Sequence, residues 1–101
     1  MMAWTIEELA AAIRQSKISP VEATETCLAR IHRLDGRLRA FITPDPEGAL
    51  RTARELEAEG TAGRWRGPLH GVPLAFKDLC HLRGLPTSCG TKTREYFVTR
   101  A

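Results

Sequence analysis

The chain has 101 residues, which is enough for one small hydrophobic core. Hydrophobic residues make up 43% of it and charged residues 27%, a composition that excludes the low hydrophobicity and high charge of disordered proteins. The net charge is +3, and the three cysteines are irregularly spaced, which argues against disulfides. No run approaches the roughly 20 apolar residues of a membrane helix. We therefore predict a cytoplasmic protein without disulfides.

Two helices are predicted at the N-terminus. In WTIEELAAAI, Thr5 can cap a helix, and Glu8 stands three residues later to complete a capping box. In ISPVEA, Ser19 can act as N-cap and Pro20 can occupy the first helical position, where its missing N–H costs nothing. We expect the second helix to stop at Gly36 and the two helices to lie antiparallel.

Apolar residues recur at helical spacing along both segments and predict their buried faces. These residues are Ile6, Leu9, Ala10 and Ile13 in the first helix, and Cys27, Leu28, Ile31 and Leu34 in the second. The alternation in residues 38–43 then predicts a short strand or extended segment, ended by the turn TPDP. A third helix is expected to begin at Pro46 and to end at Gly60.

The last third of the chain has a different character. A glycine-rich loop leads into VPLAF, which reads as a buried strand, and residues 80–97 show mostly turn chemistry with a short helix near their end. A strand needs neighbours because its N–H and C=O groups must be paired. The segment 38–43 is the other strand candidate, so the pattern predicts partner strands that this chain does not contain.

Positive charge is concentrated in RIHRLDGRLR, residues 30–39, which could form a patch for RNA or an acidic partner. The segment carries leucine and isoleucine at helical spacing and has no aromatic residue on which a base could stack. These features favour a solvated helix face, and we expect no nucleic acid partner.

Four residues of the last third, His70, Cys80, His81 and Cys89, are candidate metal ligands. Zinc sites use closely spaced ligand pairs, and these four form neither a CxxC nor an HxxxH pattern. We expect no metal and no cofactor, and we assign these residues to packing.

Lys77 closes the apolar run in GPLHGVPLAFKDL. In one interpretation, which spacing alone favours, it is a strand-end charge that reaches solvent and pairs with Asp78. In the other, apolar surroundings remove the hydration of the charged form, so that a neutral amine can act as a general base near neutral pH. Glycines such as Gly71 would let backbone or substrate approach this segment closely.

GPLHGVPLAFKDL followed by GLPTSCGTK resembles the early core of the amidase signature family, in which a GPL.G.P...KD segment carries the catalytic lysine and a G..T..G turn follows. Upstream, SPVEATETCLARI resembles the second N-terminal helix of that family, and RAFIT resembles its next extended segment. The resemblance covers nearly the whole chain, and it favours the catalytic interpretation of Lys77.

This resemblance implies an α/β fold in which residues 1–60 form an N-terminal helical region and residues 61–101 begin a mixed-sheet core with its first strands. It also implies a hydrolase of small carboxylic amides with a serine, cis-serine, lysine triad. Lys77 matches the triad lysine, and Asp78 matches the acid beside it, which we assign to structure or orientation. The remaining matching positions are supporting ones: Gly71, Gly90 and Thr91.

The two serines of the family lie in a glycine- and serine-rich segment many tens of residues beyond the lysine, whereas this chain stops at Ala101. Its own serines are Ser16, Ser19 and Ser88. The first two belong to helix ends, and Ser88 lies in a turn without a glycine-lined oxyanion pocket. We therefore expect one incomplete domain, the N-terminal fragment of an amidase, that is inactive alone.

Two alternatives stay open. The amphipathic helices could dock on a partner, which would make the chain a non-catalytic helical adaptor, and exposed apolar faces could also drive self-association. The chain could instead belong to the amidase subunit of a tRNA-dependent amidotransferase, which the same segments resemble and which would imply partner subunits and glutamine as ammonia donor.

Overall fold

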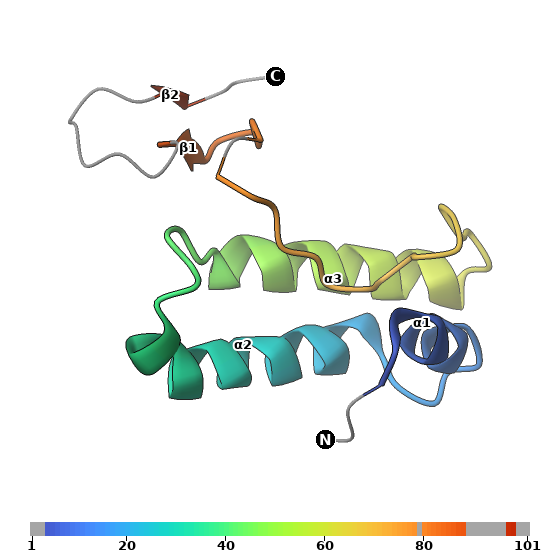
Figure 1. Ribbon diagram of the computed structural model, residues 1–101. Coiled ribbons are helices and arrows are strands. Elements are labelled where there is room, and N and C mark those ends of the chain that lie inside the picture. Colours follow the sequence, from blue (N-terminus) through green and yellow to red (C-terminus); the bar gives the residue numbers. More distant parts are fainter. Residues whose placement is uncertain (1–3, 79, 89–96, 99–101) are drawn as a thin grey trace.

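The computed structural model describes residues 4–78, 80–88 and 97–98. Its elements are the helices α1 (Ile6–Arg14), α2 (Pro20–Leu38) and α3 (Pro46–Thr61) and the short strands β1 (Pro86–Thr87) and β2 (Phe97–Val98). The two strands pair antiparallel, with Pro86 opposite Val98. Figure 1 shows α2 and α3 side by side, with α1 crossing one end of this pair and the strands standing apart from the helices.

The predicted helix starts are confirmed because each depends on contacts within a few residues. The Thr5 side chain accepts the Glu8 N–H at 3.1 Å, and the Glu8 carboxylate accepts the Thr5 N–H at 3.3 Å, which completes a capping box. Ser19 caps α2 by accepting the N–H three residues on at 3.0 Å. Asp45 caps α3 in the same way at 3.2 Å, and both helices carry proline in the first turn.

The predicted end of α2 is wrong. The helix continues through Gly36 to Leu38, and the chain leaves it at Arg39, which is left-handed with φ 50°. The Arg39 N–H donates to the Asp35 carbonyl at 2.6 Å, and the Asp35 carboxylate accepts the N–H of Ala40 at 2.7 Å. Asp35 therefore satisfies the backbone beyond the helix, and Gly36 is tolerated as an exposed interior position.

The predicted end of α3 at Gly60 is also displaced. The helix ends in a Schellman motif in which Gly63, with φ 79°, donates to the Gly60 carbonyl at 3.0 Å and Arg64 donates to the Glu59 carbonyl at 2.8 Å. Gly60 has a different role, because a Cβ at this position would lie 3.0 Å from the ring of Trp65. The absence of a side chain at Gly60 makes room for that indole.

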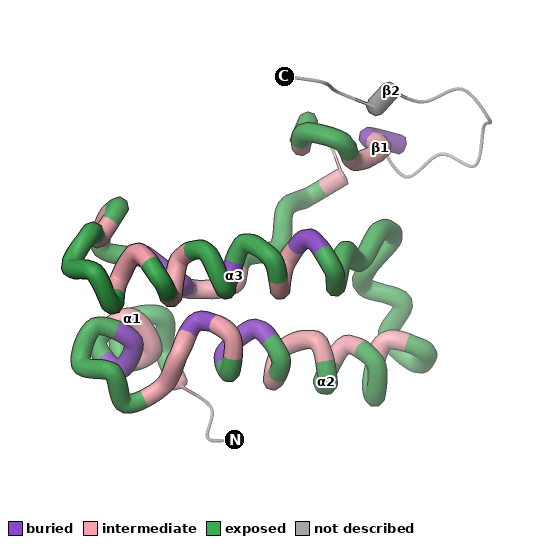
Figure 2. Tube along the Cα trace, turned by 180° about the vertical axis from the view of Figure 1, so that it is seen from behind, coloured by how far each residue is buried: buried purple, intermediate pink, exposed green. Residues whose placement is uncertain are grey.

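The antiparallel pair is α2 and α3, and not the first two helices as predicted (Figure 1). The buried apolar residues are mostly small: Ala12, Ile13, Ala23 and Ala53. Of the predicted apolar faces, Ile13 is buried, whereas Ile6 and Leu34 are exposed. Figure 2 shows how few residues are buried along the helices. None of the helices within the described ranges combines the length and the apolar character needed to cross a bilayer.

The two predicted strands at residues 72–77 and 38–43 are wrong. Residues 72–77 run without strand pairing, and Leu74 and Phe76, expected to be buried, are 59% and 57% exposed. Residues 38–43 complete α2 and then bend. Among the described residues no neighbouring backbone pairs with either segment, and a lone strand gains too little to form.

The helix predicted near the end of residues 80–97 lies largely outside the described residues. Within the described part, Phe97–Val98 forms strand β2 instead. Its partner β1 is equally short, so this pair is a local ribbon and not a sheet that could carry a core.

The molecule exposes an unusual amount of surface for its size. Its accessible surface is 7910 Å², whereas a compact monomer of 11.2 kDa exposes about 5,700 Å². Its radius of gyration is 15.0 Å, against about 13 Å for a compact domain of this length. The chain is therefore extended around a small helical core.

Gly71 attaches the segment after α3 to that core. It is buried with φ 85°, and a Cβ there would lie 2.7 Å from Pro20 Cγ and 3.4 Å from Ile13 Cγ2. Both the backbone conformation and the close approach to the start of α2 require glycine. Gly63 shares the positive φ but has nothing within 4 Å of its Cβ position, so it provides a matched control.

We predict that Gly71→Ala lowers the free energy of unfolding by about 2–4 kcal/mol, since left-handed strain and overpacking against Pro20 add together. Gly63→Ala, which carries the strain alone, should cost about 1 kcal/mol. Urea unfolding followed by helical circular dichroism measures both. Equal losses in the two variants would show that the contact with Pro20 is unimportant.

Candidate active site

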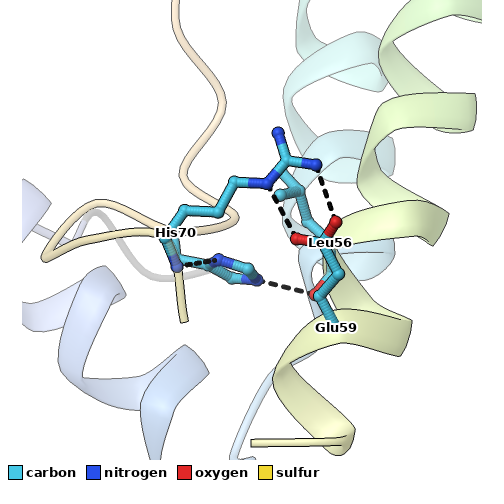
Figure 3. Close-up of polar contacts among 4 residues, drawn as sticks. Leu56, Glu59 and His70 are labelled. Atoms are coloured by element: carbon cyan, nitrogen blue, oxygen red, sulfur yellow. Dashed lines mark hydrogen bonds and ion pairs between the residues drawn. The ribbon is translucent and has the colours of Figure 1, made fainter. Parts of the chain in front are cut away.

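His70 ties the segment that leads to the predicted lysine onto α3 (Figure 3). Its Nδ1 accepts the N–H of Arg66 at 3.0 Å, so its Nε2 carries the proton and donates to the Leu56 carbonyl at 2.7 Å. The side chain is only 6% exposed. Both ring nitrogens are thus used inside the protein, which agrees with the structural role predicted for this histidine and leaves neither for a metal ion.

Trp65 packs on His70. Its ring meets the His70 ring edge to face, with centroids 4.9 Å apart at 68°. The Arg14 guanidinium lies 4.6 Å from the Trp65 ring centroid and donates to the Gly67 carbonyl at 3.3 Å. These contacts join the loop after α3 to α1.

Glu59 and Arg66 also join α3 to the loop that follows it, through a bidentate ion pair in which both guanidinium contacts to the carboxylate measure 2.7 Å. The hydrogen bond from Arg66 holds the pKa of Glu59 below its usual value of 4.5. The hydrogen bond to Glu59 correspondingly raises the pKa of Arg66. The pair therefore favours the folded state when Glu59 is ionised.

Lys77 lies seven residues after His70, at the end of the unpaired stretch 72–77. The side chain is exposed, as the solvent-charge interpretation predicted. Among the described residues Lys77 and Asp78 do not form the predicted ion pair with each other. The Lys77 carbonyl accepts the N–H of Cys80 at 2.9 Å, which turns the chain immediately after the lysine.

Lys77 lines an open pocket of about 430 Å³. One wall is the connection between α2 and α3, residues 40–43, which offers mainly apolar side chains. The other wall is residues 75–78 together with Cys80, Leu82, Leu85 and Pro86. The lysine thus lies where two loops far apart in sequence meet, with Asp78 and Cys80 as the other titratable groups of the lining.

Asp78 is directed at Ser88, ten residues later. One carboxylate oxygen accepts the Ser88 N–H at 3.0 Å, and the other accepts the Ser88 hydroxyl in a short hydrogen bond. Ser88 is 9% exposed. The carboxylate thus closes the turn that follows Lys77, and the structural or orienting role of Asp78 stays a prediction.

A second hydroxyl reinforces the turn. Thr87 is 4% exposed, and its hydroxyl lies 3.1 Å from His81 Nδ1 and 3.5 Å from the Cys80 carbonyl. Cys80 and His81 are themselves exposed, so their predicted packing role is wrong. Within residues 4–78, 80–88 and 97–98 no group of three or more potential ligands could hold a metal ion.

The structure brings only part of the predicted site together. Lys77 and Asp78 share the pocket, whereas Gly71 lies outside its lining, against Pro20 at the start of α2. Gly90 and Thr91, as well as Cys89, lie outside the described residues. The partnership of Asp78 with Ser88 was not predicted, since nothing in a ten-residue spacing indicates which serine a carboxylate will meet.

The chain was compared with known proteins. The family model described as Amidase matches residues 22–101. Two curated relatives are subunits of glutamyl-tRNA(Gln) amidotransferase: that of Acidothermus cellulolyticus is 45% identical over 94 residues, and that of Aromatoleum aromaticum is 47% identical over 95. The alignments cover 93% and 94% of this chain but 19% of each relative, so the chain spans about a fifth of their length.

A solved structure also matches. It is the crystal structure of a bacterial aryl acylamidase of the amidase signature family, with a TM-score of 0.82 and 28% identity. The match covers 86% of this chain and 18% of that one. The mostly helical arrangement with its short strand pair therefore corresponds to the N-terminal part of an α/β amidase signature enzyme, which confirms the predicted fold class.

We predict that the Glu59–Arg66 pair makes stability pH-dependent in the acid range. Since the pKa of Glu59 is lowered in the folded state, the stabilisation is present above pH 4.5 and is lost as the pH falls through the lower folded value. Glu59→Gln should flatten the fall of the melting temperature between about pH 6 and pH 3. Glu25→Gln, which removes an exposed charge on α2 itself, is the control and should keep the wild-type slope.

Proposed function

This chain belongs to the amidase family, and from that membership we propose that it is the N-terminal part of an enzyme that hydrolyses carboxylic amides. The observation that carries the proposal is the position of Lys77, which lines a pocket together with residues 40–43 of the connection between α2 and α3. The aligned aryl acylamidase, by its name an enzyme that cleaves aryl amides, supports the amide substrate class.

In the proposed mechanism Lys77 is the general base. Its neutral amine takes a proton through a bridging serine from the nucleophilic serine, whose oxygen then bonds to the amide carbonyl carbon. Backbone N–H groups stabilise the oxyanion, the C–N bond breaks as the leaving amine is protonated, and water releases the acyl group as an acid. Asp78 orients the lysine segment and takes no proton.

The serines of this chain are poor candidates for the two missing roles. Ser16 lies at the end of α1 with φ 59°, and Ser19 caps α2. The Ser88 hydroxyl donates to Asp78, which engages the proton that a nucleophilic serine must give to its base. We therefore propose that both serines belong to a segment outside this chain and that the chain alone is inactive.

The exposed apolar surface fits the same proposal. Phe41, Ile42, Leu74 and Phe76 are 38–62% exposed and lie in or beside the two loops that form the pocket. The accessible surface exceeds that of a compact monomer by about 2,200 Å². We propose that residues 1–60 are a helical region, that residues 61–101 begin the core of a single domain, and that further strands of the amidase fold cover this surface.

A narrower function is a role within a tRNA-dependent amidotransferase, favoured by the names of the two relatives. Such a protein would work with partner subunits and take glutamine as its amide substrate.

The two cysteines that the structure describes are free thiols, which supports our proposal of a cytoplasmic location.

We predict that the chain restores amide hydrolysis when it replaces the aligned 18% of the aryl acylamidase, and that Lys77→Ala in this chimera lowers kcat by about 10²–10⁴-fold. The base acts on the nucleophile in the transition state, so KM should change little. Release of arylamine from an aryl amide measures the rate. Lys17→Ala, an exposed lysine between α1 and α2, is the matched control and should retain activity.

The 101-residue chain alone should release no ammonia or arylamine above a blank during long incubation with aliphatic and aromatic amides. Turnover by the chain alone that disappears on Lys77→Ala would contradict the proposed inactivity. An active chimera that is insensitive to Lys77→Ala would contradict the assignment of the base.

We also predict that the isolated chain self-associates through the apolar residues beside the pocket. Phe76→Glu should shift the weight-average mass toward the monomer in light scattering, because an exposed charge opposes burial of this face. Thr52→Glu, at an exposed position of α3, adds the same charge elsewhere and should not change the mass. Association that is identical in both variants would place the contact on another surface.

A further inference from the structure

Residues 72–77 are a stretch of backbone without a neighbouring strand. They contain no turn or bend and lie in the uncoiled trace that leads from α3 to β1 (Figure 1). A turn closes each end: the Val72 N–H donates to the Leu69 carbonyl at 3.0 Å, and the Lys77 carbonyl accepts the Cys80 N–H at 2.9 Å. Between these ends, no described backbone pairs with the stretch. Such free N–H and C=O groups are a template for a further strand.

The two edges of this stretch differ in the backbone groups that they offer. In an extended chain, alternate residues direct their N–H and C=O groups to the same edge. One edge includes Leu74 and Phe76, whose N–H and carbonyl groups are not engaged by any described residue. The other edge includes Pro73, Ala75 and Lys77, where proline has no N–H and the Lys77 carbonyl is already engaged. The edge of Leu74 and Phe76 therefore has more to gain from pairing.

The side chains beside this edge are apolar and exposed. Leu74 and Phe76 are 59% and 57% exposed, and Phe41 and Ile42, which line a pocket with Phe76, are exposed as well. The chain exposes about 2,200 Å² more than a compact monomer of its mass, whereas a standard interface takes about 800 Å² from each partner. The exposed surface is thus large enough for a dimer to bury.

We propose that this edge pairs antiparallel with the same edge of a second copy of the chain, so that Ala75 faces Ala75 across a two-fold axis. In this register Leu74 exchanges both of its backbone hydrogen bonds with Phe76 of the second copy, and Phe76 does the same with Leu74. The four hydrogen bonds occupy the free groups of these residues. They leave out Val72, whose N–H is engaged by the Leu69 carbonyl.

The side chains fit the same register. Directly opposite residues of a strand pair lie on one face, so each Leu74 packs on Phe76 of the other copy. Ala75 occupies the non-hydrogen-bonded position at the axis, where the two backbones come closest and a small side chain fits. Lys77 lies opposite Pro73 and not opposite a second lysine, so like charges do not face each other.

This inference goes beyond the self-association predicted above, which needs only apolar contact and no particular backbone geometry. It does not rest on the proposed function, because it needs neither a catalytic lysine nor an amide substrate. In a longer protein, the strands that we propose to cover this surface would compete with the second copy for the same edge.

The first test places charges at the axis of the 101-residue chain. Ala75→Glu sets two carboxylates opposite each other and Ala75→Lys two ammonium groups, so each variant alone should dissociate with a constant about two- to fivefold higher than that of the wild type. An equimolar mixture should regain the wild-type association, because glutamate then faces lysine. Light scattering over a concentration series measures the mass, and helical circular dichroism checks the fold.

The mixture distinguishes the proposed pairing from a general effect of charge or from damage to the fold. A charge that weakened association at another surface would not be compensated by the opposite charge at the same position. A mixture that associates no better than its two components would overturn the proposal, as would a wild-type chain that remains monomeric throughout the series.

The second test reads the register. In a background in which the native cysteines are replaced (Cys27→Ser, Cys80→Ser and Cys89→Ser), Ala75→Cys should form an intermolecular disulfide with oxidised glutathione. The Cα atoms of a non-hydrogen-bonded pair lie about 4.5 Å apart, which a disulfide can span.

Leu74→Cys in the same background is the matched control. Its counterpart in the second copy lies diagonally, at about 7–8 Å, so it should cross-link about tenfold more slowly. Non-reducing electrophoresis measures both rates. Equal rates, or faster cross-linking of Leu74→Cys, would overturn the proposed pairing about Ala75.

Discussion

The neutral ring of His70, shared between the Arg66 N–H and the Leu56 carbonyl, is the contact on which the arrangement of the chain depends. It joins the loop after α3 to the helix itself, in a buried position where an unpaired polar group would be costly. Trp65 and Gly71 pack beside it, the first on Arg14 and the second on the start of α2. These contacts thus join the helices to the segment that follows α3.

From this anchor the chain runs without pairing to Lys77 and turns at Asp78. Its course is then set by polar contacts, namely the two hydrogen bonds of Asp78 to Ser88 and those of Thr87 to its neighbours. Because no described strand lies beside residues 72–77, the apolar side chains of this stretch remain on the surface. In the mechanism that we propose, Lys77 needs further chain around it before its pocket excludes water.

This combination of order and exposure fits our proposal that the chain is part of a longer protein, of the kind to which it is similar over about a fifth of their length. The helical region is stabilised by its own caps and by small residues that let helices approach closely. Within the described ranges, the region around Lys77 has its turn, and no strand pairs with residues 72–77. Within one family fold, these two regions differ in how far their stabilising contacts extend along the chain.

The sequence by itself determined the starts of all three helices, since Thr5, Ser19 and Asp45 are satisfied within three residues, and the motif around Lys77 identified the family. Tertiary structure decided the rest. The end of α2 passed beyond Gly36 because Asp35 could cap a later turn, and residues 72–77 stayed out of a strand because pairing requires a distant neighbour. The partnership of Asp78 with Ser88 likewise arose from how the chain turns, because hydrogen bonds across ten residues depend on a fold that local sequence preferences do not encode.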